Sequence, residues 1–166
     1  MDTADVNIIR IFDAPRERVW EAWTDAEHVK RWWGPEGFSA PSVKQDLSVG
    51  GKFVYAMQGP PGTEWEVTNY SGGEYLEVVP MEKIVARESF TDEQGNWIDP
   101  SAIGMPGKWP EYMKVTVTFE DAGLGKTKLT IRHEGHPPKM AANAEVGWSS
   151  SLDKFARVLQ GPGARE

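Results

Sequence analysis

The hydrophobic pattern of this chain changes its period once, close to residue 137, and this change restricts the fold more than any other feature. From about residue 38 to residue 134 apolar residues alternate, which is typical of half-buried β-strands. After Pro137 and Pro138 the spacing becomes that of an amphipathic helix. The apolar residues of this helix recur three and four positions apart: Ala144, Trp148, Leu152, Phe155 and Leu159. Residues 138–160 would form a helix roughly 34 Å long, enough to cross an antiparallel sheet.

Two short helices are predicted between a first strand at residues 7–13 and the alternating region. Pro15 suits the first turn of a helix because its φ angle is already helical. Thr24 and Glu27 have the spacing of a capping box, which predicts the start of a second helix. Gly34 and Pro35 then end that helix.

Adjacent tryptophans, Trp32 and Trp33, close the second short helix. Neighbouring positions on a helix differ by about 100°, so the two rings cannot face the same way. We expect one ring to pack the short helices against the sheet. The other should border a cavity, where Gly34 redirects the chain into the next strand.

Short links rich in Gly and Pro separate the alternating segments, which favours an antiparallel meander. Ser71-Gly72-Gly73 is interpreted as an interruption between strands. Residues 92–112 form a longer link with two tryptophans, typical of a lid or a local packing cover. A sheet with one apolar face needs a cover, and the last helix is the long element that can supply it. The pattern therefore predicts an α+β fold with one curved sheet around that helix and an apolar space between them.

The composition restricts the partners. The 166 residues predict a single domain, residues 1–166, with a core at about 6–160. The net charge of −7 and the absence of a Lys/Arg run argue against nucleic acid and against an anionic membrane. No apolar run approaches the length of a membrane span and no secretory signal is present, so a cytoplasmic location is expected. The chain has no cysteine, which excludes disulfides and thiolate chemistry.

Three polar residues share the faces of inward apolar residues. His133 follows the parity of Leu129 and Ile131, and is either a histidine satisfied at the edge of the core or a polar anchor or general acid/base in the cavity. Glu88 follows the parity of Ala86 and, as an inward carboxylate, needs a partner. Gln45 is a third candidate. His133 and Glu88 are the weak candidates for catalysis, and the catalytic residues are otherwise unknown.

No metal or cofactor is predicted. The string His133-Glu134-Gly135-His136 is not a zinc motif, because in a regular strand two residues three apart point to opposite faces.

Aromatic and sulfur side chains dominate the predicted inner faces, either as an ordinary aromatic core or as the wall of a ligand pocket. Gly147, beside Trp148 in the last helix, would allow either close packing or room for a ligand. The residues predicted to bind a ligand are Trp33, Gln45, Phe53, Tyr55, Met57, Trp65, Glu88, Met113, Val115, Val117, His133, Trp148 and Phe155.

The chain resembles the START-like helix-grip superfamily (SRPBCC), and within it the small bacterial homologues of the activator of heat-shock protein 90 ATPase. The stretches that carry the resemblance span nearly the whole chain in the family's order: APRERVWEAWTDAEHVKRWWGP, VGGKFVY, YLEVVPMEKIV, VTVTFED, KTKLTIRHEGH and GWSSSLDKFARVL. The resemblance implies a START/Bet v 1-like helix-grip fold, in which the curved sheet wraps a long C-terminal helix and two short helices follow the first strand. It also implies a hydrophobic cavity.

Three functions follow as alternatives, because this fold hosts many activities. The first is binding of a small hydrophobic, aromatic or lipid-like ligand between the sheet and the last helix. The second is an enzyme resembling the polyketide cyclases, in which His133 and Glu88 move protons. The third is a chaperone partner, although the chain resembles only the C-terminal domain of the eukaryotic activators. A homodimer through a sheet edge or through residues 92–112 is compatible with the sequence, which carries no signal for it.

Overall fold

The computed structural model describes residues 3–64, 66–105 and 107–160. Seven strands form one antiparallel sheet in the order β1-β7-β6-β5-β4-β3-β2. The strands are β1 (Ala4–Phe12), β2 (Val43–Gln45), β3 (Lys52–Gln58), β4 (Thr68–Val79), β5 (Lys83–Thr91), β6 (Met113–Gly123) and β7 (Lys126–His136). The helices are α1 (Arg16–Thr24), α2 (Ala26–Trp32), the 3₁₀ helix η1 (Pro100–Ile103) and α3 (Pro138–Leu159).

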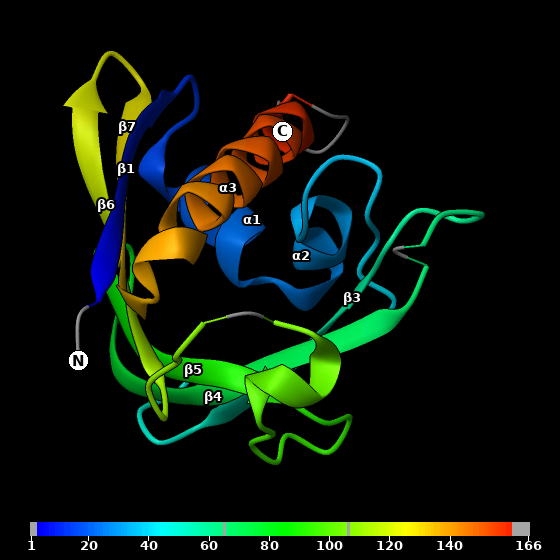
Figure 1. Cartoon of the computed structure of the whole chain (residues 1–166). Helices are drawn as coiled ribbons and strands as arrows, with labels where there is room; N and C mark the ends of the chain where they lie inside the picture. The colour runs from blue at the N-terminus through cyan, green and yellow to red at the C-terminus, as the bar shows by residue number, and fades with distance from the viewer. Residues whose placement is uncertain (1–2, 65, 106, 161–166) are drawn as a thin grey trace.

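Helix α3 lies inside the curve of the sheet. In Figure 1 the strands β1, β7 and β6 lie to the left of α3, and β4 and β5 run below it. Helices α1 and α2 lie behind α3 in this view. The predicted α+β helix-grip fold is therefore confirmed. The amphipathic pattern also predicted the bounds of α3 to within one residue, and Pro137 and Pro138 lie at its start.

The core is packed most tightly between the sheet, the two short helices and the C-terminal half of α3. Trp23, Trp32 and Phe155 pack edge-on and tilted against one another, with ring centroids 4.5–5.3 Å apart. Such offset contacts suit the ring quadrupoles and add to the hydrophobic gain of burial. Burial along α3 is uneven, because its buried residues all lie in the last nine positions: Ser151, Leu152, Phe155 and Leu159.

The capping residue of α2 differs from the prediction. The Asp25 carboxylate accepts hydrogen bonds from the backbone N–H groups of Glu27 and His28. The Thr24 hydroxyl instead donates to the Trp20 carbonyl within α1. Because α1 runs to Thr24 itself, the extended residue available between the two helices is Asp25, and a carboxylate caps as well as a hydroxyl does.

The stretch Ser71-Gly72-Gly73 does not interrupt a strand, as the sequence had suggested. It lies within the continuous strand β4. A Cβ atom on Gly73 would lie 1.8 Å from the carbonyl oxygen of Arg87 on β5, so no larger residue fits at this position. Glycine here marks a close approach of two backbones rather than a turn.

The link between β5 and β6 folds back over one end of the sheet. Trp97 forms an isolated antiparallel bridge with Thr91, and η1 follows with Asp99 as its N-cap. This link lies in front of β4 and β5 in Figure 1. Two residues of this link, Met105 and Trp109, line the site described next.

Candidate functional site

A cavity of about 460 Å³ lies between the sheet and the N-terminal half of α3. Its volume falls within the range of small-molecule sites. The wall is formed by β3 to β7, by residues 140–151 of α3, by the loop after α2 and by the β5–β6 link. Side chains therefore do not fill the interior completely, which the sequence could not decide.

Nearly half of the described residues that line the cavity are aromatic or sulfur-containing. The side chains of this kind are Trp33, Phe38, Met57, Phe90, Met105, Trp109, Met113, Met140 and Trp148. Four of the six methionines of the chain are among them. Methionine side chains are flexible and polarisable, so this wall can adapt to the shape of an apolar ligand.

One corner of the cavity is polar, and Glu88 is its centre. The Glu88 side chain, on β5, lies 2.6 Å from Nε2 of His133 on β7, measured from its Oε1 atom. Both residues are buried, with 8% and 7% of their surface exposed. Nε2 makes no well-aligned hydrogen bond, so the contact is one of charge and proximity more than of direction. The inward parity of both residues had been predicted from the sequence, and the partner that Glu88 needs is His133.

Trp148 fixes the state of the His133 ring. Its indole N–H donates to Nδ1 of His133 at 3.0 Å. An indole nitrogen can only donate, so Nδ1 must carry a lone pair. The positions of the heavy atoms therefore assign His133 to the neutral form, with its proton on Nε2 beside Glu88.

His136 lies in the same corner, contrary to the prediction that it would face away from His133. The pairing of β1 with β7 shifts between Ala4 and Val6, where one extra residue of β7 bulges out. Gly135 supplies the positive φ of 104° in this bulge. The bulge reverses the parity of the strand, and the two imidazole rings meet edge to face with centroids 4.2 Å apart.

The environment of His136 opposes a second charge. Burial, chiefly, and the neighbouring His133 lower the pKa of His136 to about 4, with Glu88 acting in the opposite direction. Its Nδ1 atom is buried without a hydrogen-bond partner among the described residues. Glu88, His133 and His136, called the polar cluster below, thus bring one carboxyl group and two imidazoles together in this corner.

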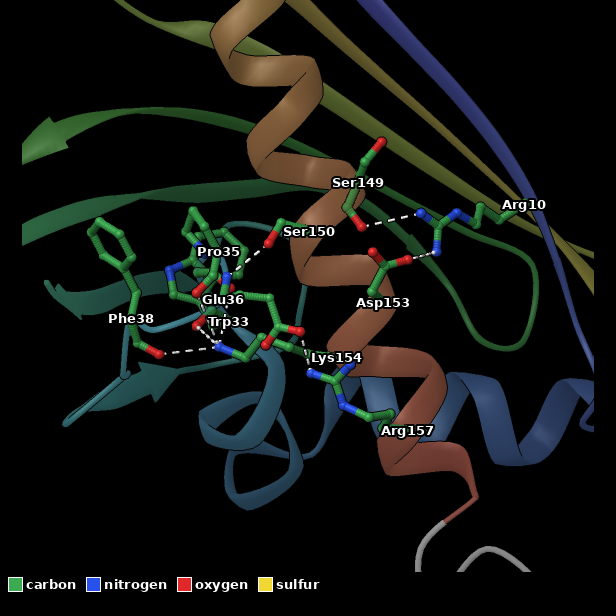
Figure 2. A network of polar contacts seen from close by, with 11 residues as sticks. Arg10, Trp33, Pro35, Glu36, Phe38, Ser149, Ser150, Asp153, Lys154 and Arg157 are labelled. Carbon is green, nitrogen blue, oxygen red and sulfur yellow. Dashed lines mark hydrogen bonds and ion pairs between the residues drawn. The ribbon is translucent and has the colours of Figure 1, made fainter. Parts of the chain in front are cut away.

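The loop at residues 33–39 forms another part of the wall and is held by α3 (Figure 2). The Lys154 ammonium lies 3.1–3.4 Å from the carbonyl oxygens of Trp33, Gly34, Pro35 and Phe38. Partial burial lowers the pKa of Lys154. The Ser150 hydroxyl accepts from the Glu36 N–H, and the Glu36 carboxylate pairs with Arg157. Side chains from three successive turns of α3 therefore set the position of Trp33 and Phe38.

Six of the predicted binding residues line the cavity: Trp33, Met57, Glu88, Met113, His133 and Trp148. The ring of Trp33 packs edge-on against Trp148 and Tyr55, whereas Trp32 is 1% exposed and donates to the Ala22 carbonyl. The two adjacent tryptophans thus divide between core and cavity wall, as their 100° separation predicted.

Six other predicted residues lie away from the cavity: Gln45, Phe53, Tyr55, Val115, Val117 and Phe155. Gln45 accepts from the Tyr55 hydroxyl and donates to the Thr24 carbonyl, so it joins the sheet to α1. The others are packed in or against the core. Those on strands share the inner face of the sheet with the lining residues, whereas Phe155 lies on α3. Trp65 lies outside the described residues.

Several lining residues escaped the sequence analysis. Met140 precedes Ala144 and Trp148 at intervals of four, so extending the helical stripe by one turn would have found it. Met105 and Trp109 lie in the long link, whose length was the available signal. Gly147, in contrast, had been named from the sequence as a position of close packing or of room for a ligand; it borders the cavity, and within 4 Å a Cβ there would meet only Pro35, at 3.9 Å. His136 gave no signal, because a strand bulge is not visible in the pattern.

Within the described residues, no group of three His, Asp or Glu side chains is arranged to hold a metal ion. The helices of that part of the chain include none long and apolar enough to cross a membrane.

An antiparallel sheet curved around a long C-terminal helix, with a cavity between the two, defines the helix-grip class of α+β proteins. Within this class the chain belongs to the family of activator of Hsp90 ATPase homolog 1-like proteins, whose model matches residues 13–160. The resemblance stated from the sequence is therefore confirmed.

Solved structures agree with this assignment. Protein CV1439 from Chromobacterium violaceum is 29% identical with a TM-score of 0.76, over 95% of this chain and 98% of that one. A protein from Arthrobacter aurescens is 27% identical with a TM-score of 0.77, over 95% and 87% of the two chains. The AHSA1 protein from Silicibacter pomeroyi, at 23% identity and a TM-score of 0.73 over 95% and 98%, shares the fold. No curated protein matches the chain.

Proposed function

We propose that the protein binds a small hydrophobic molecule, aromatic or lipid-like, in the cavity between the sheet and α3. The observation that carries this proposal is the unfilled volume of about 460 Å³ behind a wall of aromatic and methionine side chains. An apolar space of this size would normally be closed by packing, because interiors are as dense as organic crystals. A ligand that takes up this space would bury apolar surface against this wall.

The fixed loop 33–39 supports binding by a preformed site. Lys154 and Ser150 hold the backbone that carries Trp33 and Phe38. A wall that is already ordered loses little conformational freedom when a ligand enters. The flexible methionines on the other sides would supply the final fit.

The test uses a neutral fluorescent probe, N-phenyl-1-naphthylamine, and two matched variants of α3. Ala144→Phe places a phenyl ring in the cavity wall, whereas Ala142→Phe places the same ring at an exposed position of the same helix. We expect Ala144→Phe to weaken the affinity for the probe at least tenfold and Ala142→Phe to leave it unchanged. Equal affinity of both variants would contradict binding in the cavity. Native mass spectrometry of the purified protein would then identify any retained natural ligand.

An enzyme resembling the polyketide cyclases is the second candidate. The convergence of Glu88, His133 and His136 on one corner of the cavity favours it, because a proton-transfer site needs an acid and a base within reach of the substrate. Turnover of a retained ligand that is lost in both Glu88→Gln and His133→Ala, with the fold preserved, would support catalysis. Unchanged turnover in both variants would refute it.

A chaperone-associated role is the third candidate and rests on the family description. A pull-down with purified heat-shock protein 90 and an ATPase assay test it directly. Stimulation of the ATPase by this chain would favour it over the cavity-based functions, and no retention of the chaperone would count against it.

A further inference from the structure

The polar cluster gives the cavity a chemical polarity. Among the described lining residues, Glu88 is the one acidic side chain, and no lysine or arginine lines the wall. The cluster lies at one corner of a surface whose other polar side chains are uncharged, namely Ser71, Ser89, Asn143 and Ser151. A ligand that fills the cavity therefore presents one end of itself to a carboxylate.

The carboxylate of Glu88 has no cationic partner in the described part of the chain. The one basic side chain in close contact with it there is His133, whose Nδ1 accepts from Trp148. The ring can accept at Nδ1 only in the neutral form. His133 thus places an N–H near the carboxylate but does not neutralise its charge.

A buried carboxylate is stabilised by hydrogen-bond donors and by positive charge. The protein supplies one poorly aligned N–H, and His136 adds a buried nitrogen without a partner. Further donors could come from a ligand. A second carboxylate at this corner would instead meet like charge with no cation to offset it.

The positions of Trp33, Trp109 and Trp148 in the same wall also favour a donor. Indole faces carry negative potential and attract cations and polarised N–H groups. The wall and the corner thus have the same electrostatic preference.

We propose that the ligand of this cavity is amphipathic, with an aromatic or alicyclic body and one hydrogen-bond-donating end, a hydroxyl or a protonated amine, that donates to Glu88, and that ligands ending in a carboxylate, fatty acids included, are rejected. This assignment rests on the proposed binding function and adds the class of ligand to it. The rejection of acids is part of the specificity, because specificity is a difference between two affinities.

Four probes with the same body test the assignment: 2-methylnaphthalene, 2-naphthylmethanol, 2-naphthylmethylamine and 2-naphthoate. Their dissociation constants are measured at neutral pH through displacement of N-phenyl-1-naphthylamine. We expect the alcohol or the amine to bind at least tenfold tighter than 2-naphthoate. If the amine binds more tightly than the alcohol, the charge contributes most to the affinity. If the two bind equally, the hydrogen bond contributes most. Either result supports the proposal.

Glu88→Gln and Glu74→Gln form the matched pair of variants. Glu74 pairs with Arg87 on the outer face of the sheet, one position away in the β4–β5 register. In Glu88→Gln the affinity for the alcohol or the amine should exceed that for 2-naphthoate by less than threefold. In Glu74→Gln the tenfold difference should remain. A preference that survives Glu88→Gln, or tighter binding of 2-naphthoate to the unmodified protein, overturns the proposal.

The control for the proposed function lies in the same series. If 2-methylnaphthalene binds but the alcohol, the amine and 2-naphthoate bind with equal affinity, the cavity binds apolar ligands and only the assignment of the polar end is wrong. If none of the four binds, both proposals fail. A separate readout needs no ligand: ¹⁵N spectra of the histidines should show His133 with its proton on Nε2, and Trp148→Phe should change that pattern. Doubly protonated His133 at neutral pH would contradict the argument.

Discussion

The two halves of α3 face very different surroundings. Its last nine residues place Leu152, Phe155 and Leu159 in the buried core, where the Phe155 ring meets Trp23 of α1 and Trp32 of α2. Its first half presents Met140, Ala144 and Gly147 to a cavity. One amphipathic stripe thus serves both as a packing surface and as the wall of a site. The difference lies in what faces the stripe.

Trp32 and Trp33 show the same difference between two adjacent residues. Trp32 is fully buried and its indole N–H is bonded to the Ala22 carbonyl. Trp33 is half-buried at the cavity, and its buried indole nitrogen has no hydrogen-bond partner among the described residues. Stability should therefore depend on the first ring and binding on the second.

The largest expected effect is the loss of Trp32. Trp32→Ala should lower the free energy of unfolding by about 3–5 kcal/mol, since it leaves a cavity in a packed core. Trp33→Ala should cost roughly 1–2 kcal/mol, because its ring already borders empty space. Urea denaturation of both variants measures the two values. Equal losses would show that the two ends of the core are packed alike.

A second expected effect is a loss of stability in acid that originates in the cavity. The pKa of His136 is about 4 in the folded protein, below its ordinary value of about 6.5. The unfolded chain therefore binds a proton that the folded protein does not, and stability falls as the pH drops from 6.5 to 4. The shift corresponds to about 3 kcal/mol at most. Solvent in the cavity screens part of this, so about 1–2 kcal/mol is expected.

The variant His136→Phe isolates this contribution from that of the acidic residues. Burial and the neighbouring His133 ring lower the pKa of His136, whereas Glu88, a hydrogen bond with the His133 backbone and Asp5 raise it. Unfolding of the unmodified protein and of His136→Phe is compared at several pH values between 4 and 7. The difference in free energy of unfolding between the two proteins should change by about 1–2 kcal/mol over this pH range. A difference that does not change with pH would show that another group takes up the proton.

The third expected effect concerns the loop 33–39. Lys154→Met removes the ammonium that several backbone carbonyls share, which should cost about 1–2 kcal/mol. Amide hydrogen exchange of residues 34–39 should increase. Arg157→Met is the control, because its ion pair with Glu36 is exposed and such pairs contribute about 0–1 kcal/mol. Unchanged exchange in Lys154→Met would mean that the loop holds its shape without α3.

The smallest expected effect has the opposite sign. Gly147→Ala should stabilise the protein by about 0.5–1 kcal/mol, because alanine favours a helix and the new Cβ meets only Pro35 at 3.9 Å. Thermal unfolding measures the gain. A loss of stability would show that the backbone of α3 needs glycine at this point, as β4 needs Gly73.

Much of this protein was determined by local pattern. The change in the period of the hydrophobic pattern at residue 137 predicted the region of the sheet and the bounds of α3. Strand parity gave the inward direction of Glu88 and His133, since side chains alternate strictly along a regular strand. The 100° step of a helix separated the two tryptophans. Each of these follows from the geometry of one element.

Other features were decided only by the tertiary structure. His136 joined the site because a bulge, set by pairing with β1, reversed the strand's parity. Asp25 became the cap because α1 ended one residue later than a capping box at Thr24 would require.

The choice between a filled and an open interior was also tertiary. Phe53, Tyr55 and Phe155 share the inner face with Met57, Met113 and Trp148, yet only the second group borders the cavity. A pattern records which way a side chain points. Whether space remains beside it depends on the volumes of residues far apart in the chain, which only their packing together determines.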